Sequence, residues 1–142
     1  MVYTVGVKFQ GINKKLDYAP EHMFSLSEPT ANKMIKAGDG TGMYNLIKHC
    51  RTHLVWIYSK GLRVNSTNYE LHRYWSAGAH LVAMNWQTLD HGYMINHAMF
   101  QKNGRSSYVL KSAALDLGPG HKELLSKRMC HYLDLTIISA QQ

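Results

Sequence analysis

The feature that most constrains the fold is the alternation of short strand-like runs with helix-length segments along the 142 residues. The strand-like runs are rich in β-branched and aromatic residues and cover 2–9, 22–27, 52–59, 80–87 and 105–111. Helical spacing of apolar residues marks 29–37, 43–50 and 90–104, with one short helical turn at 72–78. Strands separated by helix-length connections usually pair in parallel, so this order predicts an α/β fold with a largely parallel sheet.

Two of these elements carry more specific signals. Ser27 is expected to cap the helix at 29–37, Pro29 fits its first turn, and the glycines at 38, 40 and 42 are expected to end it. The run 80–87 is apolar enough to predict a strand that is buried on both faces.

The C-terminal part of the chain breaks the alternation. Residues 114–130 contain Gly-Pro-Gly and mixed charges and are interpreted as a linker, and 131–142 begins a fresh strand. The strands and helices before the linker fall short of a closed eight-stranded barrel, which usually needs about 250 residues. The sequence therefore predicts an incomplete barrel with open sheet edges that something else must cover.

Composition narrows the partners but does not name one. Sixteen Lys and Arg against nine Asp and Glu give a formal charge of +7, which favours partners that carry phosphate. Cys50 and Cys130 show no metal-ligand spacing and are expected to be reduced thiols of an intracellular protein. No segment has the apolar length of a signal peptide or a membrane span, so contact with a bilayer is expected to be peripheral.

Four motifs, in order, resemble a known family. They are FSLSE (24–28), RTHLVWIYSKGLRVNSTNY (51–69), YWSAGAHLVAMNWQTLD (74–90) and MFQKNGRSSYVLK (99–111). Together they resemble the Y half of the catalytic barrel of eukaryotic phosphoinositide-specific phospholipase C, a distorted (β/α)8 barrel built from X and Y halves. The resemblance covers 1–113, and LDLTIISAQQ resembles the opening strand of the C2 domain that follows the barrel. The expected organisation is a Y half-barrel at 1–113, a linker at 114–130 and a truncated C2 start at 131–142.

The resemblance also implies a division of labour. The whole enzyme hydrolyses phosphatidylinositol 4,5-bisphosphate to diacylglycerol and inositol 1,4,5-trisphosphate with calcium, and its catalytic histidines and calcium carboxylates belong to the X half. This chain is accordingly expected to hold no catalytic residue and no metal, and to be inactive without an X half. Its expected partners are a phosphoinositide headgroup, an anionic membrane surface and the X half, and its expected location is cytoplasmic with peripheral membrane association.

Three positions correspond to residues with which the family's Y half grips the inositol phosphates. Ser25 and Tyr58 match the family pattern, whereas Trp56 stands where arginine is usual. Losing a charge-assisted contact there predicts headgroup affinity lower by about one to two orders of magnitude, unless Lys60 or Arg63 substitutes. Further departures from the family pattern are Ser59, Leu62, Ala79 and Ser107.

Simpler interpretations of the same residues stay open. Ser25 could be a turn residue, Tyr58 an ordinary cross-strand aromatic, and Lys60 with Arg63 part of a solvated basic rim. His49 and His53 lie on either side of a helix-to-strand junction, so they are not expected to share a helical face, and no zinc site is predicted. The alternative function is a non-catalytic module that binds anionic membranes or signalling proteins. Nucleic-acid binding is disfavoured because the aromatic residues are not interleaved with basic residues on one face.

Overall fold

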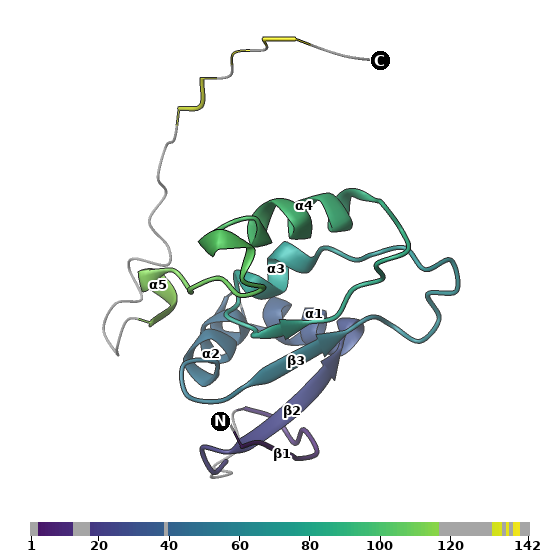
Figure 1. The fold of residues 1–142 in the computed structure, drawn as a ribbon. Coiled ribbons are helices and arrows are strands. Elements are labelled where there is room, and N and C mark those ends of the chain that lie inside the picture. Colours follow the sequence, from purple (N-terminus) through teal and green to yellow (C-terminus); the bar gives the residue numbers. More distant parts are fainter. Residues whose placement is uncertain are drawn as a thin grey trace.

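The protein is an α/β structure with four parallel strands in the order β1-β2-β3-β4 (Figure 1). This computed structural model describes residues 3–12, 18–38, 40–116, 132–134, 136, 138 and 139. The strands are β1 (Val5–Gly6), β2 (His22–Ser27), β3 (Val55–Tyr58) and β4 (Leu81–Val82). The helices are α1 (Glu28–Lys36), α2 (Thr41–His49), α3 (Leu71–Trp75), α4 (His91–Phe100) and α5 (Ala113–Asp116), with a 3-10 turn, η1, at Asn103–Arg105.

Period-two alternation in β2 and β3 builds the core on the side of the sheet that the helices cover. Phe24 lies opposite Val55 and Leu26 lies opposite Ile57, and all four side chains are almost completely buried. Because successive strand side chains point to opposite faces, the residues between them must lie on the other side of the sheet. The core therefore fixes which side chains the sheet presents away from the helices.

That second side of the sheet, called the inner face below, consists of Ser25, Ser27, Trp56, Tyr58 and Leu81. Ser25 lies opposite Trp56, Ser27 lies opposite Tyr58, and Trp56 also lies opposite Leu81. No described element covers the inner face: Trp56, Tyr58 and Leu81 are 42%, 41% and 49% exposed. A parallel sheet is normally covered on both faces, so this exposure is unusual for the fold class.

The first helix follows the prediction closely. Strand β2 has the predicted bounds, and α1 begins one residue earlier than predicted. Ser27 is the N-cap with extended backbone, and Pro29 lies in the first turn. The Ser27 hydroxyl bonds to the Thr30 hydroxyl at 2.9 Å and makes no bond to a helix N–H, so the capping is weaker than the sequence suggested.

The glycines after α1 have different roles. Gly38 and Gly40 have φ angles of +59° and +93°, which turn the chain between the two helices. Gly42, expected to help end α1, instead lies in the first turn of α2, where a Cβ atom would meet the Met34 carbonyl oxygen at 1.9 Å. Gly42 thus permits the close approach of α1 and α2.

Several strand predictions were wrong in extent or environment. Among the described residues, the predicted strand at 2–9 is reduced to Val5–Gly6 in β1, and the one at 52–59 to Val55–Tyr58 in β3. The predicted strand at 80–87 is reduced to Leu81–Val82 in β4, and the half-exposed Leu81 contradicts burial on both faces. The predicted strand at 105–111 does not form, and Tyr108 and Leu110 in it are 63% and 87% exposed. A strand needs a ladder partner on its edge, and no described segment pairs with 105–111.

The remaining segments are only partly described. Ala113–Asp116, at the start of the predicted linker, is the short helix α5. Most of the linker and half of the predicted C2 start lie outside the described residues. Within the described residues, no helix is long and apolar enough to cross a membrane.

Candidate functional site

The inner face brings together all three residues predicted to contact a ligand. Ser25 and Trp56 are direct neighbours on adjacent strands, which in a sheet lie about 4.8 Å apart. Tyr58 follows Trp56 on the same face, and the two rings meet edge to face with centroids 6.4 Å apart. Ser25, Trp56 and Tyr58 are all exposed, so they form one continuous surface of hydroxyl groups and aromatic rings.

This surface suits a hydroxylated ring better than an apolar ligand. Hydroxyl groups such as those of Ser25 and Tyr58 both donate and accept hydrogen bonds. Aromatic rings can pack against the C–H face of a sugar while the Tyr58 hydroxyl stays polar. These strand residues carry no charge, so contact with a phosphate group needs a cation from elsewhere.

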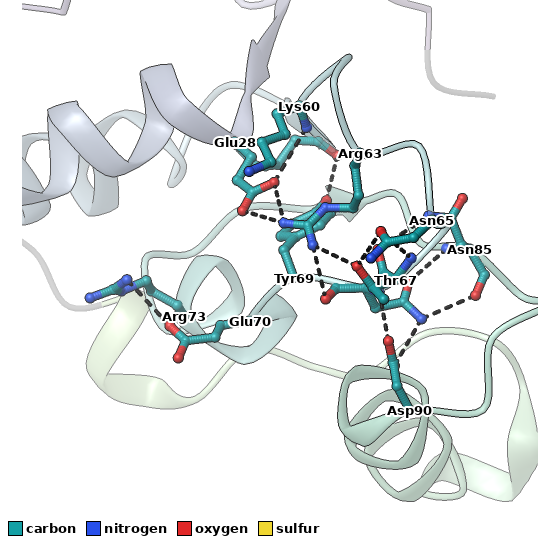
Figure 2. Close-up of polar contacts among 12 residues, drawn as sticks. Glu28, Lys60, Arg63, Asn65, Thr67, Tyr69, Glu70, Arg73, Asn85 and Asp90 are labelled. Carbon is teal, nitrogen blue, oxygen red and sulfur yellow. Dashed lines mark hydrogen bonds and ion pairs between the residues drawn. The ribbon is translucent and has the colours of Figure 1, made fainter.

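Arg63, which the sequence offered as a substitute cation, is committed to an internal ion pair (Figure 2). Its Nη2 atom donates to both carboxylate oxygens of Glu28 at 2.7 Å, and its Nη1 atom donates to the Thr67 hydroxyl at 3.0 Å. The guanidinium also lies over the Tyr69 ring, 5.8 Å from its centroid. Only 15% of the Arg63 side chain and 14% of the Glu28 side chain is exposed. Arg63 therefore holds the loop after β3 in place instead of facing the inner side.

A second polar cluster joins the loops after β3 and β4 (Figure 2). The side-chain nitrogen Nδ2 of Asn68 donates to the carbonyl oxygens of Asn85 and Thr88 and to Asp90 Oδ1. The side-chain oxygen Oδ1 of Asn68 accepts a hydrogen bond of 2.7 Å from the backbone N–H of Asn85. Burial alone would raise the pKa of Asp90, but hydrogen bonds from Asn68 and from the N–H groups of Tyr93 and Gly92 outweigh it and lower this pKa. The cluster fixes the ends of both strands relative to each other.

Tyr69 adds a buried connection beneath these loops. Its hydroxyl donates to the Ala83 carbonyl oxygen at 2.7 Å and lies 3.3 Å from the Ile57 carbonyl oxygen. Burial raises the pKa of Tyr69, so the hydroxyl stays protonated and keeps donating. The Glu28–Arg63 pair, the Asn68 cluster and Tyr69 were not predicted, because long-range contacts such as these leave no local pattern in the sequence.

A cavity of about 420 Å³ lies on the helix side, between α1, α3 and α4. Its lining includes Glu28, Asn32, Arg63, Tyr69 and Asp90, but none of the inner-face residues. Most of its charged groups already have partners within the protein. The cavity follows from the polar packing described above and is separate from the inner face.

The opposite end of the sheet holds a cluster of histidine, lysine and cysteine side chains. The Lys111 ammonium donates to the Cys50 carbonyl oxygen and contacts His80 Nε2, both at 2.7 Å. The rings of His49 and His53 stack with centroids 4.5 Å apart, although α2 ends at His49 and the two residues do not share a helical face. Among the described residues, no three histidine, cysteine or carboxylate side chains are placed to hold a metal.

The Cys50 thiol is a core group. Cys50 is 1% exposed, and burial, partly offset by the Lys111 charge, raises the pKa of its thiol to about 12. At neutral pH the thiol is protonated and unreactive.

Comparisons with known proteins agree with this architecture. The family model "Phosphatidylinositol-specific phospholipase C, Y domain" matches residues 1–114. The chain is 40% identical over 114 residues to 1-phosphatidylinositol 4,5-bisphosphate phosphodiesterase 1 of Candida albicans, covering 80% of this chain and 10% of that protein. It is 38% identical over 117 residues to the Saccharomyces cerevisiae protein of the same name, covering 78% of this chain and 13% of that protein.

Solved structures give the same answer for the fold. The crystal structure of L. pealei PLC21 superposes with a TM-score of 0.71 at 32% identity, covering 81% of this chain and 14% of that one. The S. officinalis PLC21 structure gives the same TM-score at 31% identity, covering 89% and 15%. The chain thus spans only about a tenth to a seventh of the length of these relatives. It belongs to the phosphatidylinositol-specific phospholipase C family, with residues 1–114 as the Y domain.

Proposed function

We propose that this chain is the Y half of the barrel of a phospholipase C that hydrolyses phosphatidylinositol 4,5-bisphosphate to inositol 1,4,5-trisphosphate and diacylglycerol. The chain supplies headgroup contacts and half of the barrel wall. The single observation that carries the proposal is the uncovered inner face, where Ser25, Trp56 and Tyr58 stand together. The names of the relatives support the substrate.

In this proposal, an X half packs over the inner face and covers it. Leu81, Trp56 and Tyr58 leave a broad apolar surface in contact with water, and covering such surface contributes about 25 cal/mol per Å². β1 and β4 are the two outer strands of the described sheet, so each offers an edge to further strands. A second half that pairs with both edges would close the barrel over the inner face.

In this proposal the chemistry comes from the X half. There the inositol 2-hydroxyl would form a bond to phosphorus as the bond to the diacylglycerol oxygen breaks, with a base histidine taking the hydroxyl proton and an acid histidine protonating the departing oxygen; water would then open the cyclic phosphodiester. Calcium held by the X half would supply stabilisation of the developing negative charge. Calcium prefers six to eight oxygen ligands, and the inner face offers hydroxyl groups but no carboxylate. The described residues therefore do not fit calcium, and the Y half only binds and orients the sugar ring.

Membrane contact is part of the same proposal. Leu62 and Val64, in the loop after β3, are 87% and 90% exposed, and Lys60 is exposed beside them. Apolar side chains next to a lysine suit the surface of an anionic bilayer, where each basic residue contributes on the order of 1 kcal/mol. This exposure supports peripheral membrane contact. The cytoplasmic location, the linker at 114–130 and the C2 start at 131–142 belong to the proposal through the family resemblance alone.

A complementation assay tests the proposed function. The purified chain, a separately expressed X half from a relative, and their mixture are each given phosphatidylinositol 4,5-bisphosphate in mixed micelles with calcium. The expected result is calcium-dependent release of inositol trisphosphate from the mixture alone. Release by the isolated chain would contradict the assignment of the chemistry to the X half.

The alternative is a non-catalytic membrane-binding module, which is favoured by Trp56 at a position where the family usually has arginine. Vesicles of equal total charge that contain either phosphatidylserine or phosphatidylinositol 4,5-bisphosphate separate the two functions. Equal binding to both favours the module, whereas preference for the phosphoinositide favours headgroup recognition.

A further inference from the structure

Extending the β1–β2 register by two residues puts Lys8 level with Ser25. Gly6 is the ladder partner of Met23, and the pairing of these strands continues through a 2.8 Å hydrogen bond from the Val7 N–H to the Met23 carbonyl oxygen. Val7 and Phe9 both pack against the core on the helix side. β1 ends at Gly6, but Val7 and Phe9 continue its alternation, and from this we infer that the exposed Lys8 between them faces the inner side, in the row that contains Ser25.

Among the described residues, the Lys8 ammonium has no polar partner, unlike the Arg63 guanidinium. The Lys8 side chain makes no hydrogen bond or ion pair with the described part of the chain. Lys8 also follows β1, at the carboxyl end of the strand, which is the end where parallel barrels place their ligand-binding residues. A lysine in this row, with no ion pair to the described residues, supplies the charge that the uncharged strand residues of the inner face lack.

We propose that Lys8 binds a phosphate group of the ligand, with Ser25 between it and Trp56. The ligand class is a phosphorylated polyol ring, either free or as a lipid headgroup. The indole of Trp56 packs against the ring, the Ser25 hydroxyl donates to a phosphate oxygen, and the ammonium pairs with the phosphate charge. This inference rests on the proposed headgroup contact by the inner face, and it adds a cation that neither the sequence motifs nor the comparisons assign.

The chemistry of lysine fits this role. Its ammonium is a compact point charge on a flexible stem with three donors, so it can reach a phosphate from a neighbouring strand without a fixed geometry. A contact between two partly hydrated charges contributes only a modest binding free energy. We therefore expect removal of the Lys8 charge to weaken binding about three- to tenfold.

The test measures affinity of the 142-residue chain for inositol 1,4,5-trisphosphate by NMR titration, with Lys8→Gln, Lys8→Arg and the control Lys33→Gln. Lys33 is an exposed lysine of α1, so its variant removes the same charge away from the inner face. We expect a three- to tenfold loss for Lys8→Gln, at most about twofold changes for Lys8→Arg and Lys33→Gln, and a shallower salt dependence for Lys8→Gln only. Unmodified inositol, which carries no phosphate, is expected to bind the wild type and Lys8→Gln equally.

The outcomes separate this inference from the proposed function. Equal losses from Lys8→Gln and Lys33→Gln, or no loss from either while the wild type binds, would overturn the role of Lys8 and leave the proposed function intact. No binding of the trisphosphate by the folded wild type would contradict headgroup contact itself, and with it this inference. Vesicles carrying phosphatidylinositol 4,5-bisphosphate then show whether the lipid form is bound as well. Circular dichroism melting of each variant verifies that it is folded.

Discussion

The Glu28 carboxylate receives two hydrogen bonds of 2.7 Å from Nη2 of Arg63, a residue 35 positions later in the chain. The pair links the first turn of α1 to the loop after β3 and lies largely out of contact with water. Arg63 is also held by the Thr67 hydroxyl and the Asn68 carbonyl oxygen. One ion pair thereby sets the position of the loop that borders the inner face.

Glu28→Gln is expected to lower the free energy of unfolding by on the order of 2 kcal/mol, because it leaves the buried Arg63 charge without its partner. Urea denaturation measures this loss. Glu70→Gln is the control: the Arg73–Glu70 pair is 3.3 Å long with 38% and 68% exposed side chains, so its removal should cost less than about 0.5 kcal/mol. Equal losses for the two variants would contradict the structural role of the Glu28–Arg63 pair.

Gly42→Ala is expected to destabilise the protein by about 1 to 3 kcal/mol, since the new methyl group would overlap the Met34 carbonyl oxygen and force α1 and α2 apart. Thermal unfolding followed by circular dichroism measures the change. Gly61→Ala adds the same methyl group where no atom lies within 4 Å, and it should change stability little. A stable Gly42→Ala variant would show that the two helices are not in close contact.

Asn68→Ala is expected to loosen the connection between the loops after β3 and β4. The substitution removes the acceptor of the Asn85 N–H and the donor to Asp90, whereas the backbone bond from the Asn68 N–H to Asp90 remains. Hydrogen exchange at the Asn85 amide should accelerate by at least about tenfold, while exchange at the Ile57 amide in β3 should change little. Unchanged exchange at Asn85 would contradict the anchoring role of Asn68.

Acid is expected to destabilise the protein through two partly buried histidines. Burial, together with the charges of His53 and His80, lowers the pKa of His49 to about 4, and burial together with Lys111 lowers the pKa of His80 to about 4. Between pH 4 and 6.5 both imidazoles are mainly neutral in the folded protein. In the unfolded chain, a histidine has its ordinary pKa of about 6.5 and gains a proton below that pH. Stability is therefore complete above pH 6.5 and should fall as the pH drops from 6.5 towards 4.

His49→Phe tests this pH dependence. The new ring can keep the stacking on Phe24 but cannot take up a proton, so the loss of stability between pH 6.5 and 4 should become smaller. His72→Phe at an exposed position should leave the slope unchanged. Urea denaturation at a series of pH values gives both slopes, and an identical slope for wild type and His49→Phe would contradict the assignment.

Local patterns predicted the elements whose own residues decide their structure. Strand β2 has the predicted bounds, and α1 lies within one residue of the prediction, because alternation, Ser27 and Pro29 act within a few residues. Alternation also fixes the common face of Ser25, Trp56 and Tyr58 once the strands pair in parallel. The common face of these three side chains, on which the candidate site depends, was therefore predictable from the sequence.

The errors lie where structure depends on distant partners. The predicted strand at 105–111 has strand composition but no ladder partner among the described residues, so composition alone misled the prediction. Leu81 was expected to be buried, although burial depends on what covers the inner face. Arg63 was offered as a substitute cation, but the fold commits it to Glu28, which no local pattern could reveal.

The most direct test of headgroup binding by the inner face is a titration of the isotope-labelled chain with inositol 1,4,5-trisphosphate, followed by NMR. We expect the largest shifts on the amides of Ser25 and Tyr58 and on the indole N–H of Trp56, with small shifts in α1 and α2. Saturable shifts confined to the helix side, or no shifts at millimolar ligand in a folded sample, would contradict the claim that the inner face binds the headgroup.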